Sequence, residues 1–158
     1  MKTLLTLCHG LQERTFEPGE LLLAEGETDD LLYVLIEGEV EVFRGDTLVN
    51  RQSEPGAIFG ELAVLLDRPH TANVRASKAT RAFMTEQARS FLRSSPDLSY
   101  HLAVILGHKL NSITSYLVDL KQQFADRSDH LGMVDEVLDS LLHEPVSDLQ
   151  PGSDRCPD

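Results

Sequence analysis

The most informative part of the chain is a single stretch, which reads Phe59-Gly60-Glu61-Leu62-Ala63-Val64-Leu65-Leu66-Asp67-Arg68-Pro69-His70-Thr71-Ala72-Asn73-Val74-Arg75-Ala76. A glycine, an acid and small or apolar residues open a short predicted helix, and a loop then returns the chain to a strand. The N-terminus of a helix is suited to bind phosphate, because it carries unpaired N–H groups and a partial positive charge. An acid beside it would instead accept hydrogen bonds from sugar hydroxyls. Phosphate and sugar together indicate a nucleotide.

The residues around this stretch form short β-type runs separated by glycines. Between Phe16 and Met84 the breaks fall at Gly19, Gly26, Gly38, Gly45, Gly56 and Gly60. The runs between them span residues 21–23, 32–36, 40–43, 47–49, 73–76 and 81–84. Many short strands at this turn spacing predict an all-β barrel or sandwich. Leucines in residues 2–13 predict a short helix before it.

From about Gln87 the apolar residues follow a helical period. The pattern predicts a short helix ending before Pro96, a long helix from there, and a last helix over residues 133–143. In the long helix the apolar spacing alternates between four and three residues, a heptad-like seam made of Leu106, Leu110, Ile113, Leu117, Leu120 and Phe124. The seam could pack on the β-rich part, but its distal half extends beyond what that part can cover. We therefore expect a homodimer through this helix.

The stretch 59–76 resembles the phosphate-binding cassette of cyclic-nucleotide-binding domains, which occur in the catabolite activator protein, in kinase regulatory subunits and in gated channels. The family pattern reads Phe-Gly-Glu-Leu-Ala, a few residues, and then Pro-Arg-Ala/Thr-Ala-Thr-Val, and residues 59–63 match its first half throughout. The glycines at 19, 26, 38 and 56 also fall at the family's turns. The resemblance covers roughly residues 10–125. It implies an α+β fold: a jelly-roll-like β-barrel with an N-terminal helical piece and C-terminal helices.

The resemblance also implies a ligand, cAMP or cGMP, and a set of binding residues: Phe59, Gly60, Glu61, Leu62, Ala63, His70 and Thr71. Backbone N–H groups at the start of the cassette helix would bind the cyclic phosphate, and Glu61 would bind the ribose 2′-hydroxyl. Thr71 stands where cGMP-preferring members have a threonine. The alternative for Glu61 is an acid that only stabilises the helix N-terminus. No cofactor is expected.

The sequence departs from the family pattern at His70, which replaces the arginine that clamps the cyclic phosphate. Arginine donates two charge-assisted hydrogen bonds at any pH, whereas histidine donates one and is charged only below its pKa, ordinarily about 6.5. Asn73 replaces the usual threonine, and neither Arg68 nor Arg75 aligns with the clamp. We therefore expect a regulatory or interaction module with weak or lost cyclic-nucleotide binding. The alternative is a genuine cAMP or cGMP sensor that signals through its C-terminal helices.

Charge argues against nucleic acid and membrane as partners. The chain of 158 residues has 14 basic and 26 acidic residues, a net charge of −12. Nucleic acids and anionic membranes attract basic proteins and repel acidic ones. No apolar run approaches the roughly 18 residues that span a bilayer. The only cysteines, Cys8 and Cys156, lie near opposite ends, which predicts free thiols and a cytoplasmic protein.

The chain divides into an N-terminal helical segment at 1–15, a β-barrel at 16–86, helices at 87–125 and an acidic part at 126–158. Residues 130–145 resemble the helix that begins the DNA-binding domain of the catabolite activator protein family. No helix-turn-helix follows, so we expect a stand-alone domain that does not bind DNA and whose partner protein the sequence does not identify. The last residues, from Glu144, should be disordered.

Catalytic and metal-binding motifs are missing from the sequence. It has neither the GxSxG nucleophile pattern nor a P-loop. His101 and His108 are seven residues apart, which is not the spacing of a helical zinc pair. We therefore expect neither an enzyme nor a metal protein.

Overall fold

The computed structural model describes residues 4–124 and 128–143. The chain divides into two compact units, Met1–Ser99 and Tyr100–Asp158, with the boundary inside the long helix. The described strands all lie in the first unit, whereas the described elements of the second unit are helical.

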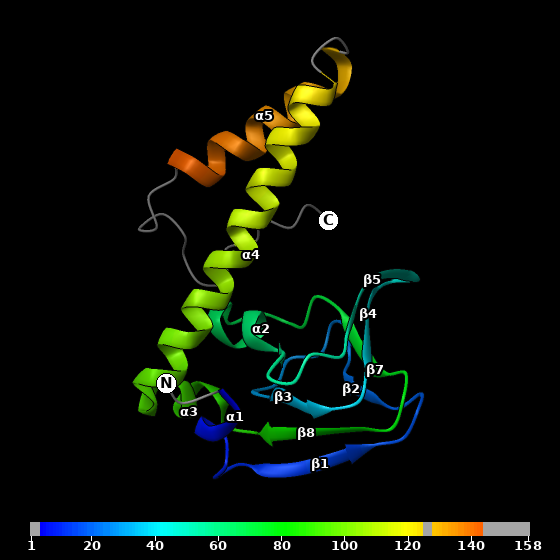
Figure 1. The fold of residues 1–158 in the computed structure, drawn as a ribbon, viewed down its shortest axis with the longest axis vertical. Coiled ribbons are helices and arrows are strands. Elements are labelled where there is room, and N and C mark those ends of the chain that lie inside the picture. The colour runs from blue at the N-terminus through cyan, green and yellow to red at the C-terminus, as the bar shows by residue number, and fades with distance from the viewer. Residues whose placement is uncertain (1–3, 125–127, 144–158) are drawn as a thin grey trace. The chain divides into compact units, whose positions relative to one another are not determined.

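The first unit is built on two four-stranded antiparallel sheets, which Figure 1 shows as two layers. One sheet has the order β1-β8-β3-β6 and the other has β2-β7-β4-β5. The strands are β1 (Gln12–Phe16), β2 (Leu21–Leu23), β3 (Leu32–Glu37), β4 (Val40–Arg44), β5 (Thr47–Gln52), β6 (Ile58–Phe59), β7 (Asn73–Ala76) and β8 (Thr80–Thr85). The jelly-roll-like prediction is confirmed, with the described strands arranged as a sandwich of two sheets rather than one closed barrel.

Three helices belong wholly to the first unit: α1 (Leu4–Leu7), α2 (Glu61–Leu66) and α3 (Ala88–Ser94). The predicted helix over residues 2–13 is wrong beyond Leu7, because residues 12–16 form β1. This strand pairs antiparallel with β8, with Gln12 opposite Met84 and Phe16 opposite Thr80. Pairing with a distant strand outweighs local propensity here, and no local pattern showed it. The two-residue strand β6 was also missed, since it is too short to show a period.

Apolar side chains between the sheets form the core that holds the sandwich together. Phe16 of β1 packs edge-to-face on Tyr33 of β3, with ring centroids 5.6 Å apart. The other buried members of this cluster come from both sheets: Leu22, Leu23, Leu35, Val40, Phe59, Val74, Ala76, Ala82 and Met84. Phe59, the first residue of the predicted site, is therefore part of the core and fixes the start of the cassette.

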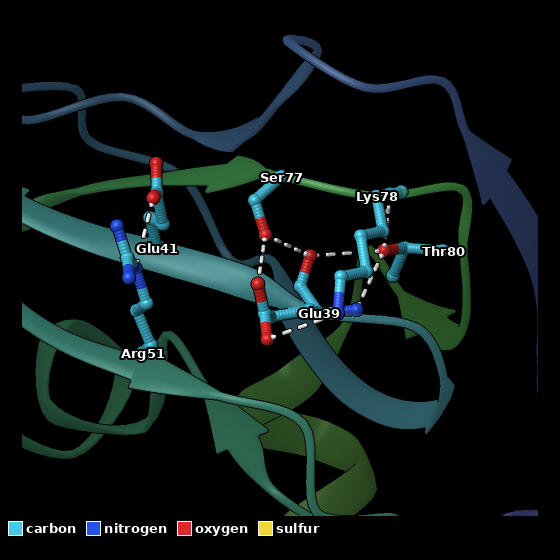
Figure 2. A network of polar contacts seen from close by, with 6 residues as sticks. All are labelled: Glu39, Glu41, Arg51, Ser77, Lys78 and Thr80. Carbon is cyan, nitrogen blue, oxygen red and sulfur yellow. Dashed lines mark hydrogen bonds and ion pairs between the residues drawn. The ribbon is translucent and has the colours of Figure 1, made fainter.

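A polar network ties the start of β4 to the turn between β7 and β8 (Figure 2). The Ser77 hydroxyl donates to a carboxylate oxygen of Glu39 at 2.8 Å, and this bond, with help from Lys78, lowers the pKa of Glu39. Gly38, just before, has φ +106°, and a Cβ there would lie 2.5 Å from the Thr80 hydroxyl oxygen. Only glycine fits this close approach, which accounts for one of the glycines in the predicted turn pattern.

The second unit contains most of helix α4 (Pro96–Gln123) and helix α5 (Ser128–His143). Both were predicted, although α5 begins five residues earlier than the predicted 133. An ion pair between Lys121 and Asp135 joins α4 to α5. Three members of the predicted seam, Leu110, Ile113 and Phe124, are exposed, with Ile113 at 54%. The seam residues thus leave apolar surface uncovered in a single chain. The tail from Glu144, predicted to be disordered, lies outside the described residues.

Cys8 follows α1 and is completely buried, and burial raises the pKa of its thiol from 9.0 to about 11. The thiolate is the reactive form, so the native thiol should be inert. In the C156S variant, we expect Cys8 to react with Ellman's reagent at pH 8 at least about 100-fold more slowly in the native protein than in urea. Because the folded pKa is the higher one, folding stability should also fall as pH rises between about 9 and 11. Rapid native labelling at pH 8 would contradict this packing.

Candidate functional site

The candidate site begins where β6 meets α2, at Gly60. Its φ is +91°, and a Cβ there would lie 2.5 Å from the carbonyl oxygen of Leu31 and 3.5 Å from Cε1 of His70. Only glycine allows both this left-handed backbone and this close approach of chain segments. Gly60 therefore places the start of α2 directly beside the His70 ring and beside residues 24–31, which form the β2–β3 loop.

His70 is held inside the protein by three hydrogen bonds to the β2–β3 loop. Its N–H donates to the carbonyl of Glu27 at 2.9 Å, and its carbonyl accepts from the N–H of Gly26 at 2.8 Å. Its ring nitrogen Nε2 lies 2.6 Å from Oδ1 of Asp29. The His70 side chain is only 3% exposed, against 25% for Asp29. At the position that the resemblance aligns with the family's phosphate clamp, this chain therefore has a buried ring bonded to one of its own carboxylates.

Asn73, the second departure from the family pattern, also bonds to the β2–β3 loop. Its Oδ1 accepts from the N–H of Glu25 at 2.8 Å. The Glu25 carboxylate in turn accepts from the N–H of Gly45, in the turn between β4 and β5, at 2.9 Å. Both residues that break the family pattern thus connect the cassette to the same neighbouring loop.

The other predicted site residues are all close to Gly60 in sequence, but their environments differ. Phe59, Glu61 and Ala63 are buried, Leu62 is exposed on α2, and Thr71 is half-buried. The structure brings Gly60 and His70 together at the start of α2. The ligand contacts assigned to these residues by the resemblance stay predictions.

Two arginines near the cassette in sequence or space are engaged elsewhere. Arg75 bonds to Glu41 at 3.1 Å and its guanidinium stacks over the ring of Phe43. Arg89 of α3 donates to Oδ1 of Asp67 at 2.8 Å and to the carbonyl of Val64 at 3.3 Å, which joins α3 to the end of α2. Arg89 also borders an open surface hollow of about 540 Å³, between the β2–β3 loop and α3.

Asp29 is the functional candidate that the sequence did not reveal. Its Oδ1 also accepts from the N–H of Leu31, a local turn that an aspartate in a loop commonly makes. Nothing in the sequence pairs it with a histidine 41 residues later. Glu25 was missed for the same reason. Only the packing of the two loops brings these groups together.

The pattern of the cyclic nucleotide-binding domain matches residues 13–92, half of the chain. The chain belongs to this family. It is 30% identical over 116 residues to a CRP-like cAMP-activated global transcriptional regulator of Mycobacterium tuberculosis, a match covering 70% of this chain and 52% of the regulator. It is also 34% identical over 73 residues to a cAMP-dependent protein kinase regulatory subunit of Yarrowia lipolytica, covering 46% of this chain and 19% of the subunit.

The fold of this cyclic-nucleotide-binding domain is also that of solved structures. The Thermus thermophilus catabolite activator protein superposes with a TM-score of 0.60 at 21% identity, over 76% of this chain and 57% of the other.

Within residues 4–124 and 128–143, no helix is long and apolar enough to cross a membrane. In the same ranges, no three histidine, cysteine or acidic side chains are grouped so that they could hold a metal ion.

The Asn73 contact predicts a local effect in the domain. In the N73A variant the N–H of Glu25 loses its acceptor, so we expect the exchange of this amide with deuterium to speed up and unfolding to cost about 1 kcal/mol less. The control is N50A, because Asn50 is an exposed residue of the edge strand β5. Two-dimensional NMR measures the exchange amide by amide. An unchanged Glu25 amide in N73A would contradict the contact.

Proposed function

We propose that this cyclic-nucleotide-binding domain acts as a regulatory or interaction module whose affinity for cyclic nucleotides is weak or lost near neutral pH. One observation carries the proposal: the residue at the clamp position is a buried histidine whose Nε2 is bonded to Asp29. A ligand that enters the cassette meets a ring whose donor is already in use. We therefore favour a module that works mainly through its fold and its partners.

The chemistry of the two side chains sets the expected size of the effect. An arginine has five donors in a planar fork, so it can bond a carboxylate and still donate to a phosphate. A neutral histidine whose Nε2–H is engaged has no second N–H to donate, because its Nδ1 is then an acceptor. Loss of a charged hydrogen bond costs roughly 1.5–3 kcal/mol, or about ten- to a hundredfold in affinity.

A second candidate, a cAMP or cGMP sensor, is favoured by the contact between α2 and α3. Arg89 bonds to the last turn of α2, and α3 leads directly into α4. A ligand that displaced the cassette would therefore act on a residue two helix turns from the start of α4. The names of the two relatives, both of which mention cAMP, support this candidate.

We further propose that the partner is a second copy of the chain, joined through the α4 seam. The support is the exposed apolar surface at Leu110, Ile113 and Phe124. A net charge of −12 disfavours DNA as a partner.

The clamp position gives the direct test of the proposed function. We expect H70R to bind cAMP or cGMP at least about tenfold more tightly than the native protein in titration calorimetry at pH 7.5, since arginine restores the missing donors. The matched control is H108R, the same substitution at an exposed position of α4. Submicromolar binding by the native protein would overturn the proposal, and no gain in a folded H70R would overturn the assignment of the weak binding to His70.

The seam gives a separate test of the homodimer. We expect the I113D/L117D variant to sediment as a monomer at concentrations where the native protein is a dimer. Burying two unpaired carboxylates in the interface would cost more free energy than the dimer gains. The S115D/Q122D variant adds the same charge to exposed positions off the seam and should remain dimeric. A native protein that sediments as a monomer at about 100 μM would contradict the proposal, because the dissociation constant of the dimer would then lie well above that concentration.

A further inference from the structure

In the contact between Asp29 and His70, the carboxylate of Asp29 stands where a bound anion would accept hydrogen bonds from the ring. Oδ1 of Asp29 accepts from two donors, Nε2 of His70 at 2.6 Å and the N–H of Leu31 at 3.0 Å. The carboxylate is a quarter exposed, whereas the ring is nearly buried beside Gly60. The protein thus supplies one negative group of its own to the ring that faces the start of α2.

The chemistry of the two groups assigns the hydrogen of this contact to the ring. An ionised carboxylate only accepts hydrogen bonds, so Nε2 of His70 is the donor in this contact. That donor cannot serve a ligand at the same time. A cyclic phosphate, which carries one negative charge, would have to displace the Asp29 carboxylate or accept its repulsion at close range.

We propose that Asp29 is a specificity-determining residue that acts as an internal anion, occupying the His70 donor and so selecting against cyclic phosphates. This inference rests on the proposed function and deepens it. The histidine alone weakens the site by replacing the arginine, and Asp29 weakens it further by keeping the histidine engaged. Removing the carboxylate frees the ring and removes a negative charge from the path of the phosphate.

The neighbouring residue provides a matched control. Asp30 also has a carboxylate in the β2–β3 loop, but its Oδ1 accepts from the N–H of Arg89 rather than from the His70 ring. Asp29→Ser and Asp30→Ser therefore change the net charge equally and only the first releases His70. Serine retains a short oxygen that can accept from a nearby backbone N–H in the turn.

The experiment measures the affinity of the full chain for cAMP and for cGMP by calorimetry at pH 7.5, in the native protein and in D29S, D30S and H70R. We expect D29S to bind at least about tenfold more tightly than the native protein, and D30S to change affinity by less than about threefold. Equal gains in D29S and D30S would assign the effect to bulk charge and overturn the inference.

The H70R arm separates the two proposals. A gain in H70R without a gain in D29S overturns the role of Asp29 and leaves the proposed function standing. No gain in either variant overturns the role of Asp29 and the assignment of the weak binding to His70, because neither side chain then limits the affinity. If D29S does not fold, D29N replaces it, since asparagine keeps an acceptor for the N–H of Leu31 and removes the charge; its failure to gain affinity also overturns the inference.

A second readout needs no nucleotide. Diethylpyrocarbonate modifies accessible imidazoles, and peptide mass spectrometry locates the modified histidine. We expect His70 to be modified faster in D29S than in the native protein and in D30S. An unchanged rate in a folded D29S would show that the carboxylate does not hold the ring, and would overturn the inference.

Discussion

The attachment of His70 to the β2–β3 loop is the constraint on which the cassette depends. Two backbone bonds and one ring bond hold this single residue against residues 26–29. Gly60 lies beside the His70 ring, and its left-handed backbone brings the start of α2 close to the same loop. The protein's own groups therefore connect the cassette to the β2–β3 loop.

The two halves of the cassette differ in their sequence and in their contacts. The first half, from Phe59 to Ala63, retains the family's sequence, and its side chains lie partly in the core. In the second half, His70 and Asn73 replace the family's residues and both bond to the β2–β3 loop. The second half of the cassette is thus engaged in contacts within the protein. Arg89 then connects the end of α2 to α3 through its bond to Asp67.

Much of the fold could be predicted from the sequence because its signals are local. Alternation of apolar residues located most strands, glycines located the turns, and the seam located α4, since each depends on residues near one another in the chain. Strand β1 was missed because its pairing with β8 joins residues about 70 positions apart, and its own leucine-rich flank favours a helix.

The candidate site could be predicted only in part, because sequence patterns do not show contacts between residues that are far apart in the chain. The cassette residues are contiguous, so Gly60 and His70 were both identified as site positions. The state of His70 was not, because Asp29 lies 41 residues before it and only tertiary packing brings the two side chains together. Asn73 was noted as a departure from the family pattern, but its bond to the N–H of Glu25 likewise joins segments far apart in the sequence.

The contact between Asp29 and His70 holds the cassette against the β2–β3 loop, and a double-mutant cycle measures its strength most directly. Unfolding free energies of the native protein, D29S, H70L and the double variant give the coupling between the two side chains. We expect a favourable coupling of about 1 kcal/mol or more, with the double variant less destabilised than the sum of the single variants. Additive effects, with coupling below about 0.3 kcal/mol, would contradict it.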